Sequence, residues 1–377
     1  MIRKLLARDT AETHRVATPL ELLFDLSFVV AVAQAAASLH HAVSENHAGA
    51  GLVAFCMAFF ALWLPWLNFT WFASAFDNDD TLYRIITMVQ IAGVLVVASG
   101  VPAVFEHQDY RIVVGGYVVI RLAMVAHWLR ASRDNPSHRS CTRRYAGGIA
   151  FMQVLWVLWV VLAPPSLQIP LWILFMIGEL LVPAWAERSG ATTWHPHHIA
   201  ERHGLFTLIV LGESILAATL AFQKGFDSGV NLISLAVASL VIVFSVWWIY
   251  FEASTHLHNL KKAFLWGYAH LFVLGSIAAL GAGLAASVDY DLHISHAPGT
   301  TVAAFTTVPL ALFFLCVWYV QDCPGQDGLR KYLLPIGAVA VVAATFGPAP
   351  IHVTAGIALV LVVVTRLVAA PAQRVAV

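Results

Sequence analysis

Charged residues are scarce in this sequence. Asp, Glu, Lys and Arg make up 11% of its 377 residues, against about 25% in an ordinary soluble domain. The 21 basic and 21 acidic residues give a net charge of zero, which indicates neither a nucleic-acid-binding surface nor a basic surface for membranes. We therefore expect no nucleic-acid partner.

Cysteine is also rare. We expect no disulfide, because Cys56, Cys141, Cys316 and Cys323 fall within predicted spans or on the cytoplasmic side, where thiols stay reduced. The chain lacks the alternation of apolar and polar residues that is typical of an outer-membrane barrel. Apolar residues are instead abundant, at 60% with 13 Trp and 22 Phe, and the mean hydropathy is +0.78. This composition predicts an integral membrane protein.

The apolar residues are grouped in runs that are long enough to span a membrane. A bilayer core of about 30 Å needs about 20 apolar residues per helix, and turn-forming pairs such as Pro164-Pro165 and Gly347-Pro348 separate the runs. The sequence therefore predicts an all-α, polytopic membrane protein with about twelve transmembrane helices. The predicted spans cover residues 19–43, 50–72, 82–104, 110–130, 147–163, 167–186, 199–222, 229–252, 263–286, 300–320, 331–346 and 349–369.

The basic residues test this topology independently, because Lys and Arg concentrate in cytoplasmic loops. With twelve spans, eighteen of the 21 basic residues fall on one side, Arg111 and Lys224 on the other, and Arg121 within a span. Both termini are therefore predicted to be cytoplasmic. Residues 1–18 show no clear apolar core and cleavage site, so we expect a cytoplasmic N-terminal segment and no removable signal peptide.

An offset of 180 residues reveals a weak internal similarity. It places Glu21 over Glu201 and Gln90 over His270. Read as a repeat, the similarity predicts two six-helix membrane halves in the same orientation, residues 19–186 and 187–377, as in parallel-repeat transporters. The alternative is chance matching between apolar helices.

Three acidic residues lie where apolar residues are expected. An ionised side chain at the centre of a membrane helix costs at least about 2.5–3.5 kcal/mol, so such groups face a bundle interior or a hydrated cavity. Glu21 and Asp25 are four residues apart and share one helix face. Glu21 could instead only complement the helix N-terminus. Glu213 lies beyond the predicted membrane midplane and is a candidate proton carrier, or else a neutral acid bonded between helices.

Arg121 lies mid-span and stays charged, so we expect one carboxylate among Asp25, Glu179 and Glu213 to neutralise it. The sequence leaves the choice among the three open. Gln90 and His270 could join these groups in a proton or substrate path. Alternatively, each is an isolated core residue whose hydrogen bonds are satisfied locally. The full set for such a path is Glu21, Asp25, Gln90, Arg121, Glu179, Glu213 and His270.

A histidine-rich segment precedes the seventh predicted span. His197 or His198 with Glu201 could share a helix face for a metal, but this signal is weak. Pro196 at a helix start, followed by exposed imidazoles at a membrane interface, explains the pattern without a metal, and we expect no metal and no cofactor. Glu201 and Arg202 are predicted to be an end cap and an interfacial charge.

Acidic residues crowd the turn after the second predicted span. Asp77, Asp79 and Asp80 are candidate catalytic acids if the protein is an enzyme, because the string Asp-x-Asp-Asp resembles the acid motif of class II terpene cyclases. The alternative is a solvated loop in which Asp79 or Asp80 caps the next helix. The aromatic side chains predicted to line a path or an interfacial belt nearby are Trp66, Trp71 and Phe72.

Several segments together resemble the bacterial low temperature requirement protein A family. They are residues 20–28, 71–80, 197–206, 211–214 and 247–251, which read LELLFDLSF, WFASAFDNDD, HHIAERHGLF, LGES and WWIYF. The resemblance spans most of the chain and implies a polytopic protein of the bacterial cytoplasmic membrane that is linked to growth in the cold. Glu252 and His203 depart from the family pattern without changing the placement of the acids.

These observations favour a proton-coupled transporter or permease in which Asp25 and Glu213 exchange protons and Arg121 holds an anionic group. The alternatives are an intramembrane enzyme that acts on an isoprenoid or lipid, with Asp79 or Asp80 as general acid, and a membrane sensor or scaffold. The expected partners are membrane lipids and an unknown small-molecule or lipid substrate. The sequence leaves the oligomeric state open.

Overall fold

The computed structural model describes residues 2–9, 12, 15–228, 232–252, 257, 259–322 and 330–373. Cys323, which we expect to be a reduced thiol, lies outside the described residues. The other three cysteines, Cys56, Cys141 and Cys316, are free thiols.

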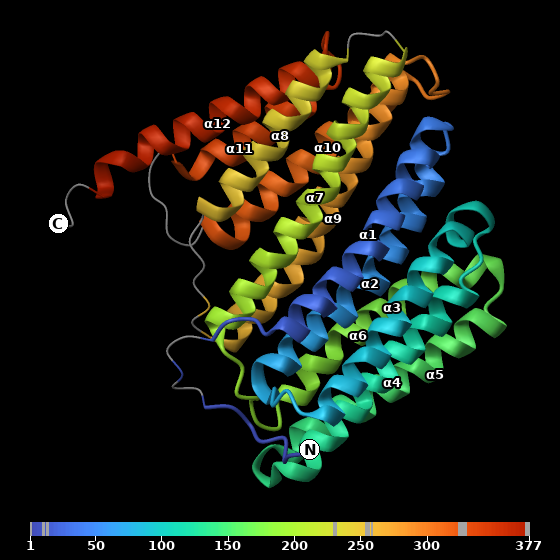
Figure 1. The fold of residues 1–377 in the computed structure, drawn as a ribbon, viewed down its shortest axis with the longest axis vertical. Coiled ribbons are helices and arrows are strands. Elements are labelled where there is room, and N and C mark those ends of the chain that lie inside the picture. Colours follow the sequence, from blue (N-terminus) through green and yellow to red (C-terminus); the bar gives the residue numbers. More distant parts are fainter. Residues whose placement is uncertain are drawn as a thin grey trace. The chain divides into compact units, whose positions relative to one another are not determined.

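The described chain is all-helical, which confirms the predicted fold class (Figure 1). Ten of its helices are long and apolar enough to cross a membrane. Helix α7 adds 33 residues, and the shorter α11 is apolar over residues 331–344. The twelve α-helices are α1 (Pro19–Ser44), α2 (Ala48–Phe76), α3 (Thr81–His107), α4 (Arg111–Asp134), α5 (Arg139–Leu162), α6 (Pro165–Glu187), α7 (Pro196–Ser228), α8 (Ile233–Glu252), α9 (Leu260–Asp291), α10 (Gly299–Val317), α11 (Arg330–Ala344) and α12 (Pro350–Gln373).

The chain forms two compact units. The first comprises residues 1–34 and 57–202, and the second comprises residues 35–56 and 203–377. Helices α1, α2 and α7 each contribute residues to both units. The predicted division into six-helix halves at residues 186 and 187 stays a prediction about an internal repeat.

In the first unit, α3 to α6 pack in chain order, each helix against the next. Glycines bring α3 and α4 together: a side chain at Gly93 would collide with Ile120, and one at Gly116 would collide with the backbone of Gly93. Small residues at a membrane helix interface permit this close approach. The packing of α3 on α4 therefore fixes the positions of Gln90 on α3 and Arg121 on α4 relative to each other.

In the second unit, α9 packs on α10, α10 on α11, and α12 on both α11 and α8. Gly283 lies so close to the carbonyl of Phe305 that any side chain there would clash. A glycine therefore permits the close packing of α9 on α10, as glycines do between α3 and α4.

Candidate functional site

A capping motif fixes Glu21 at the start of α1. The backbone N–H of Thr18 donates to Glu21 Oε2 at 2.7 Å, and the N–H of Glu21 donates to Thr18 Oγ1 at 3.3 Å. This reciprocal pair is a capping box, which satisfies two helix N–H groups. The capping role predicted as an alternative for Glu21 is therefore present, and it occupies only one of the two carboxylate oxygens.

The other oxygen of Glu21 faces α7. Glu21 Oε1 lies 2.9 Å from His198 Nε2 and 3.1 Å from Arg202 Nη1. All three side chains are fully buried. Glu21 therefore acts both as a helix cap and as the acceptor of a buried ionic cluster.

Asp25 lies one turn further along the same face of α1, as the spacing predicts, and it also pairs with Arg202. Arg202 donates to both carboxylate oxygens of Asp25, at 2.5 Å from Nη2 and 3.0 Å from Nε. Trp66 of α2 donates its indole N–H to Asp25 at 2.7 Å, and the Arg202 guanidinium lies 5.8 Å from the Phe69 ring centre. This bidentate geometry is the strong form of an Arg–carboxylate pair.

Two predictions for this segment are wrong. Arg202 is not an interfacial charge but is fully buried, because two carboxylates of α1 compensate its charge. His198 is likewise buried against Glu21 rather than exposed. Glu201, half-buried, accepts the backbone N–H of Ala17 at 3.2 Å.

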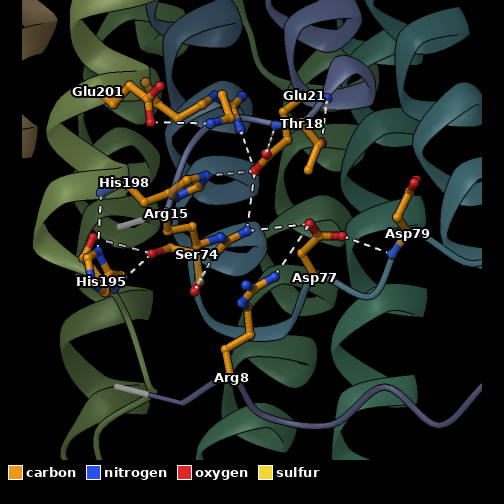
Figure 2. A network of polar contacts seen from close by, with 12 residues as sticks. Arg8, Arg15, Thr18, Glu21, Ser74, Asp77, Asp79, His195, His198 and Glu201 are labelled. Atoms are coloured by element: carbon orange, nitrogen blue, oxygen red, sulfur yellow. Dashed lines mark hydrogen bonds and ion pairs between the residues drawn. The ribbon is translucent and has the colours of Figure 1, made fainter. Parts of the chain in front are cut away.

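The cluster extends through Arg15 to the turn between α2 and α3 (Figure 2). Arg15 donates to the Ser74 carbonyl at 2.5 Å and lies 3.5 Å from Asp77 Oδ2 and 3.7 Å from Glu21 Oε1. Arg8 approaches Asp77 from the more exposed side at 4.0 Å. We call Arg15, Glu21, Asp25, Asp77, His198 and Arg202 the buried ionic network.

Asp77 is the titratable carboxylate of this network. Its burial and the negative charge of Glu21 raise its pKa to about 6, against the opposing effect of Arg15. The six residues of the network carry three carboxylates and two buried guanidinium groups, which leaves one negative charge that a proton or the partly exposed Arg8 beside Asp77 can balance. Asp77, whose pKa is raised, can hold this proton.

The raised pKa of Asp77 predicts a pH dependence of stability. The native state binds the Asp77 proton more tightly than the unfolded chain, so its free energy of unfolding falls as pH rises from about 4 to above 6. The shift of about two pKa units corresponds to roughly 3 kcal/mol. Asp77→Asn should remove this fall, as measured by reversible unfolding in mixed micelles between pH 4 and 7. Asp79→Asn is the matched control and should keep it. An equal fall in Asp77→Asn would contradict the assignment.

Glu179 is the carboxylate that neutralises Arg121, in a second buried ion pair. Arg121 of α4 donates to Glu179 Oε2 of α6 at 2.5 Å, and both side chains are buried. The other Glu179 oxygen accepts from Tyr117, Gln153 and Trp156 at 3.0, 3.1 and 3.2 Å. Asp25 pairs with Arg202 instead.

Several polar atoms around this second pair lack a partner among the described residues. They include Arg121 Nε and Nη1, both amide atoms of Gln90, and Gln153 Oε1. Gln90 lies one turn from Gly93, the glycine that packs against Ile120 beside Arg121. Because a buried polar group without a partner costs about 1–3 kcal/mol, these atoms mark a place where water or a polar solute can bind.

The other two acids of the α2–α3 turn, Asp79 and Asp80, each pair with an arginine. Asp80 caps α3 by accepting the N–H of Tyr83 at 2.8 Å and pairs with Arg130 of α4. Burial would raise the pKa of Asp80, but the hydrogen bonds from Arg130 and backbone N–H groups hold it well below its usual range. Asp79 pairs with the exposed Arg84 at 2.6 Å. The alternative prediction that one of these acids caps the next helix is confirmed.

The other predicted path residues lie in separate surroundings. Trp71 donates to Glu187 at 3.0 Å, and Phe72 packs edge-on against Trp128 with ring centres 4.8 Å apart. In the second unit, His270 contacts the Tyr250 hydroxyl at 3.0 Å, and Glu213 is half-buried. The structure thus brings Glu21, Asp25 and Asp77 together, and separately Arg121 and Glu179.

Comparison with known proteins gives two matches. A family model described as bacterial low temperature requirement A protein (LtrA) matches residues 16–369. An uncharacterized protein of Rhizobium meliloti (strain 1021) is 26% identical over 330 residues, which cover 82% of this chain and 78% of that protein. The family match includes all members of the buried ionic network except Arg15, which lies one residue before it.

Proposed function

Since the chain belongs to the bacterial low temperature requirement A family, we propose that it is a proton-coupled transporter of the bacterial cytoplasmic membrane with both termini in the cytoplasm. The observation that carries the proposal is the charge of the buried ionic network. Its three carboxylates and two buried guanidinium groups leave one negative charge, which a proton or the partly exposed Arg8 can balance, and an uncompensated buried charge is costly.

The proton enters the network at Asp77, next to the N-terminal segment that carries Arg8 and Arg15. With the proton bound, the charges balance and Arg202 holds α1 and α7 together through Glu21 and Asp25. Loss of the proton leaves one excess negative charge, which weakens this closed arrangement. Proton binding therefore favours one arrangement of the two helices over another, as coupling requires.

The solute is assigned to the interior of the first unit. Arg121 and Gln90 offer buried donors and acceptors that lack partners among the described residues. Ionisable residues inside a membrane protein mark substrate and proton pathways. An acid-catalysed reaction finds less support, because the carboxylates of Asp79 and Asp80 already pair with arginines.

Proteoliposomes loaded with a pH-sensitive dye test the proposal. With an outward-directed or inward-directed pH gradient, we expect at least one solute among panels of amino acids, amines, sugars and carboxylates to drive proton movement beyond that of protein-free liposomes. Glu21→Gln should reduce this solute-dependent flux at least tenfold, because it removes one carboxylate and the proton that the network requires.

Glu106→Gln is the matched control, because Glu106 is an exposed acid of α3 outside the network. It should keep the wild-type flux. Two results would contradict proton coupling through this network: proton movement equal to the protein-free value with every panel of solutes, or an unchanged flux in Glu21→Gln. Either result would favour a sensor or scaffold in which the carboxylates are dispensable.

A further inference from the structure

Five arginines gather at the ends of three helices of the first unit. They belong to the last turn of α4, the start of α5 and the end of α6, on the side predicted to be cytoplasmic. Four of them are exposed and one is half-buried. The net charge of the whole chain is zero, so this local excess of positive charge is hidden in the composition. We call the set the arginine patch: Arg133, Arg139, Arg143, Arg144 and Arg188.

The arginine patch lacks the ion pairs that other arginines of this unit form. The helical arginines outside the patch each contact a carboxylate, and they are Arg84, Arg111, Arg121, Arg130 and Arg202. Within the part of the chain that the structure describes, no patch arginine does so. The patch is therefore not compensated by the protein itself.

The acids that neighbour the patch in the sequence are engaged with uncharged donors. Asp134 accepts the backbone N–H of Leu5 at 2.8 Å. Glu187 is buried, and it accepts hydrogen bonds from Trp71, Tyr145 and Thr192. Five positive charges against these two negative ones leave an excess of three positive charges at this end of the unit.

The arginines at the α4–α5 connection lie close together. Arg139 Nε donates to the carbonyl of Ser132 at 3.2 Å, which places Arg139 beside the end of α4 and its Arg133. Arg139 and Arg143 are four residues apart and share one face of α5, where like charges repel. The first turn of α5 contains no acid, and the helix dipole disfavours positive charge at this end. A bound anion would offset both costs.

The patch continues to α6 at the border between charged and apolar surface. Arg144 Nη1 donates to the carbonyl of Trp185 at 3.3 Å, and its guanidinium lies 5.4 Å from the centre of the Trp185 ring. Trp185 precedes Arg188 by three residues and is 46% exposed. Phe151 of α5 and Leu181 of α6 are also exposed, about two turns and one turn further into their helices. An exposed Trp between arginines and an apolar helix surface is typical of the level of lipid headgroups.

We propose that the arginine patch binds the phosphate group of an anionic phospholipid, whose acyl chains lie along the exposed apolar surface of α5 and α6. Guanidinium groups match phosphate oxygens in a bidentate fork, and clustered basic residues at the cytoplasmic ends of membrane helices attract anionic lipids. The exposed apolar residues beside the patch favour a lipid over a free phosphate. This inference goes beyond the proposed transport, since it requires neither a proton nor a solute.

Native mass spectrometry of the purified full chain, titrated with lipid in detergent, tests the proposal. Dioleoylphosphatidylglycerol should bind at least tenfold more tightly than dioleoylphosphatidylcholine, which has the same acyl chains and no net charge. Arg139→Gln with Arg143→Gln should weaken binding of the anionic lipid about 10- to 30-fold, because each basic residue near an anionic lipid contributes about fivefold in affinity. Arg139→Lys with Arg143→Lys keeps both charges and should bind within about fivefold of the wild type.

Lys261→Gln with Lys262→Gln is the matched control, since these two basic residues are exposed at the start of α9 in the second unit, on the same predicted side. This variant should bind the anionic lipid as the wild type does. Equal affinity for the two lipids, unchanged binding in the double glutamine variant of the patch, or an equal loss in the lysine control would each overturn the proposal. Displacement of the lipid by an equal concentration of glycerol phosphate would also overturn it, because a free phosphate ester would then suffice.

Discussion

Replacing Arg202 by glutamine should lower the free energy of unfolding by about 3–5 kcal/mol, because removal of one partner leaves buried charges uncompensated. Arg202 is the common partner of Glu21 and Asp25, and all three side chains are fully buried. The change is expected to be the largest among the polar residues of the first unit. It can be measured by reversible unfolding in mixed micelles of dodecyl maltoside and dodecyl sulfate.

The double variant Asp25→Asn with Arg202→Gln separates loss of charge balance from loss of packing. It removes one charge of each sign and should recover at least half of the lost stability. A double variant with the summed losses of the two single variants would show that Arg202 and Asp25 do not stabilise each other.

Replacing Glu179 by leucine should have the second-largest effect, also about 3–5 kcal/mol, since it leaves the buried Arg121 without a carboxylate. It also deprives Tyr117, Gln153 and Trp156 of their shared acceptor. The same unfolding measurement applies. Glu106→Leu, at an exposed site, should change stability by less than about 1 kcal/mol, and a similar small loss in Glu179→Leu would refute a structural role for the pair.

Local spacing in the sequence is enough to predict part of the site. Glu21 and Asp25 share a face because they are four residues apart on one helix, and both indeed contact Arg202. The cap at the start of α3 follows from Asp80 preceding an apolar run, which is a local signal as well. The number of helices can also be predicted from the sequence, because it depends on the length of the apolar runs and on the unequal distribution of basic residues between the two sides.

Pairings between distant helices could not be predicted. Arg202 is 177 residues from Asp25 in the sequence, and its place at the start of an apolar run made an interfacial charge the natural expectation. Whether it is buried depends on which helix packs beside α7, and hydropathy carries no information about that. The choice of Glu179 for Arg121 likewise depends on the order of α4, α5 and α6 in space.

The role of Asp77 could not be predicted from the sequence either. The sequence places Asp77, Asp79 and Asp80 in one acidic turn, and spacing alone treats them alike. The structure distinguishes them by their partners: Asp80 faces Arg130, Asp79 faces Arg84, and Asp77 faces Arg15 and the buried Glu21. The last arrangement raises the pKa of Asp77 toward neutrality, so this titratable acid depends on tertiary contacts.

Infrared titration of the carboxyl C=O band in the full chain tests most directly whether the buried ionic network binds and releases a proton. The account predicts a band between about 1700 and 1750 cm⁻¹ that titrates with a pKa of about 6 in the wild type and is absent in Asp77→Asn. In Glu21→Gln the same band should titrate at a lower pH, because the charge of Glu21 raises the pKa of Asp77. A spectrum without such a band, or a band that titrates identically in Glu21→Gln, would contradict the account.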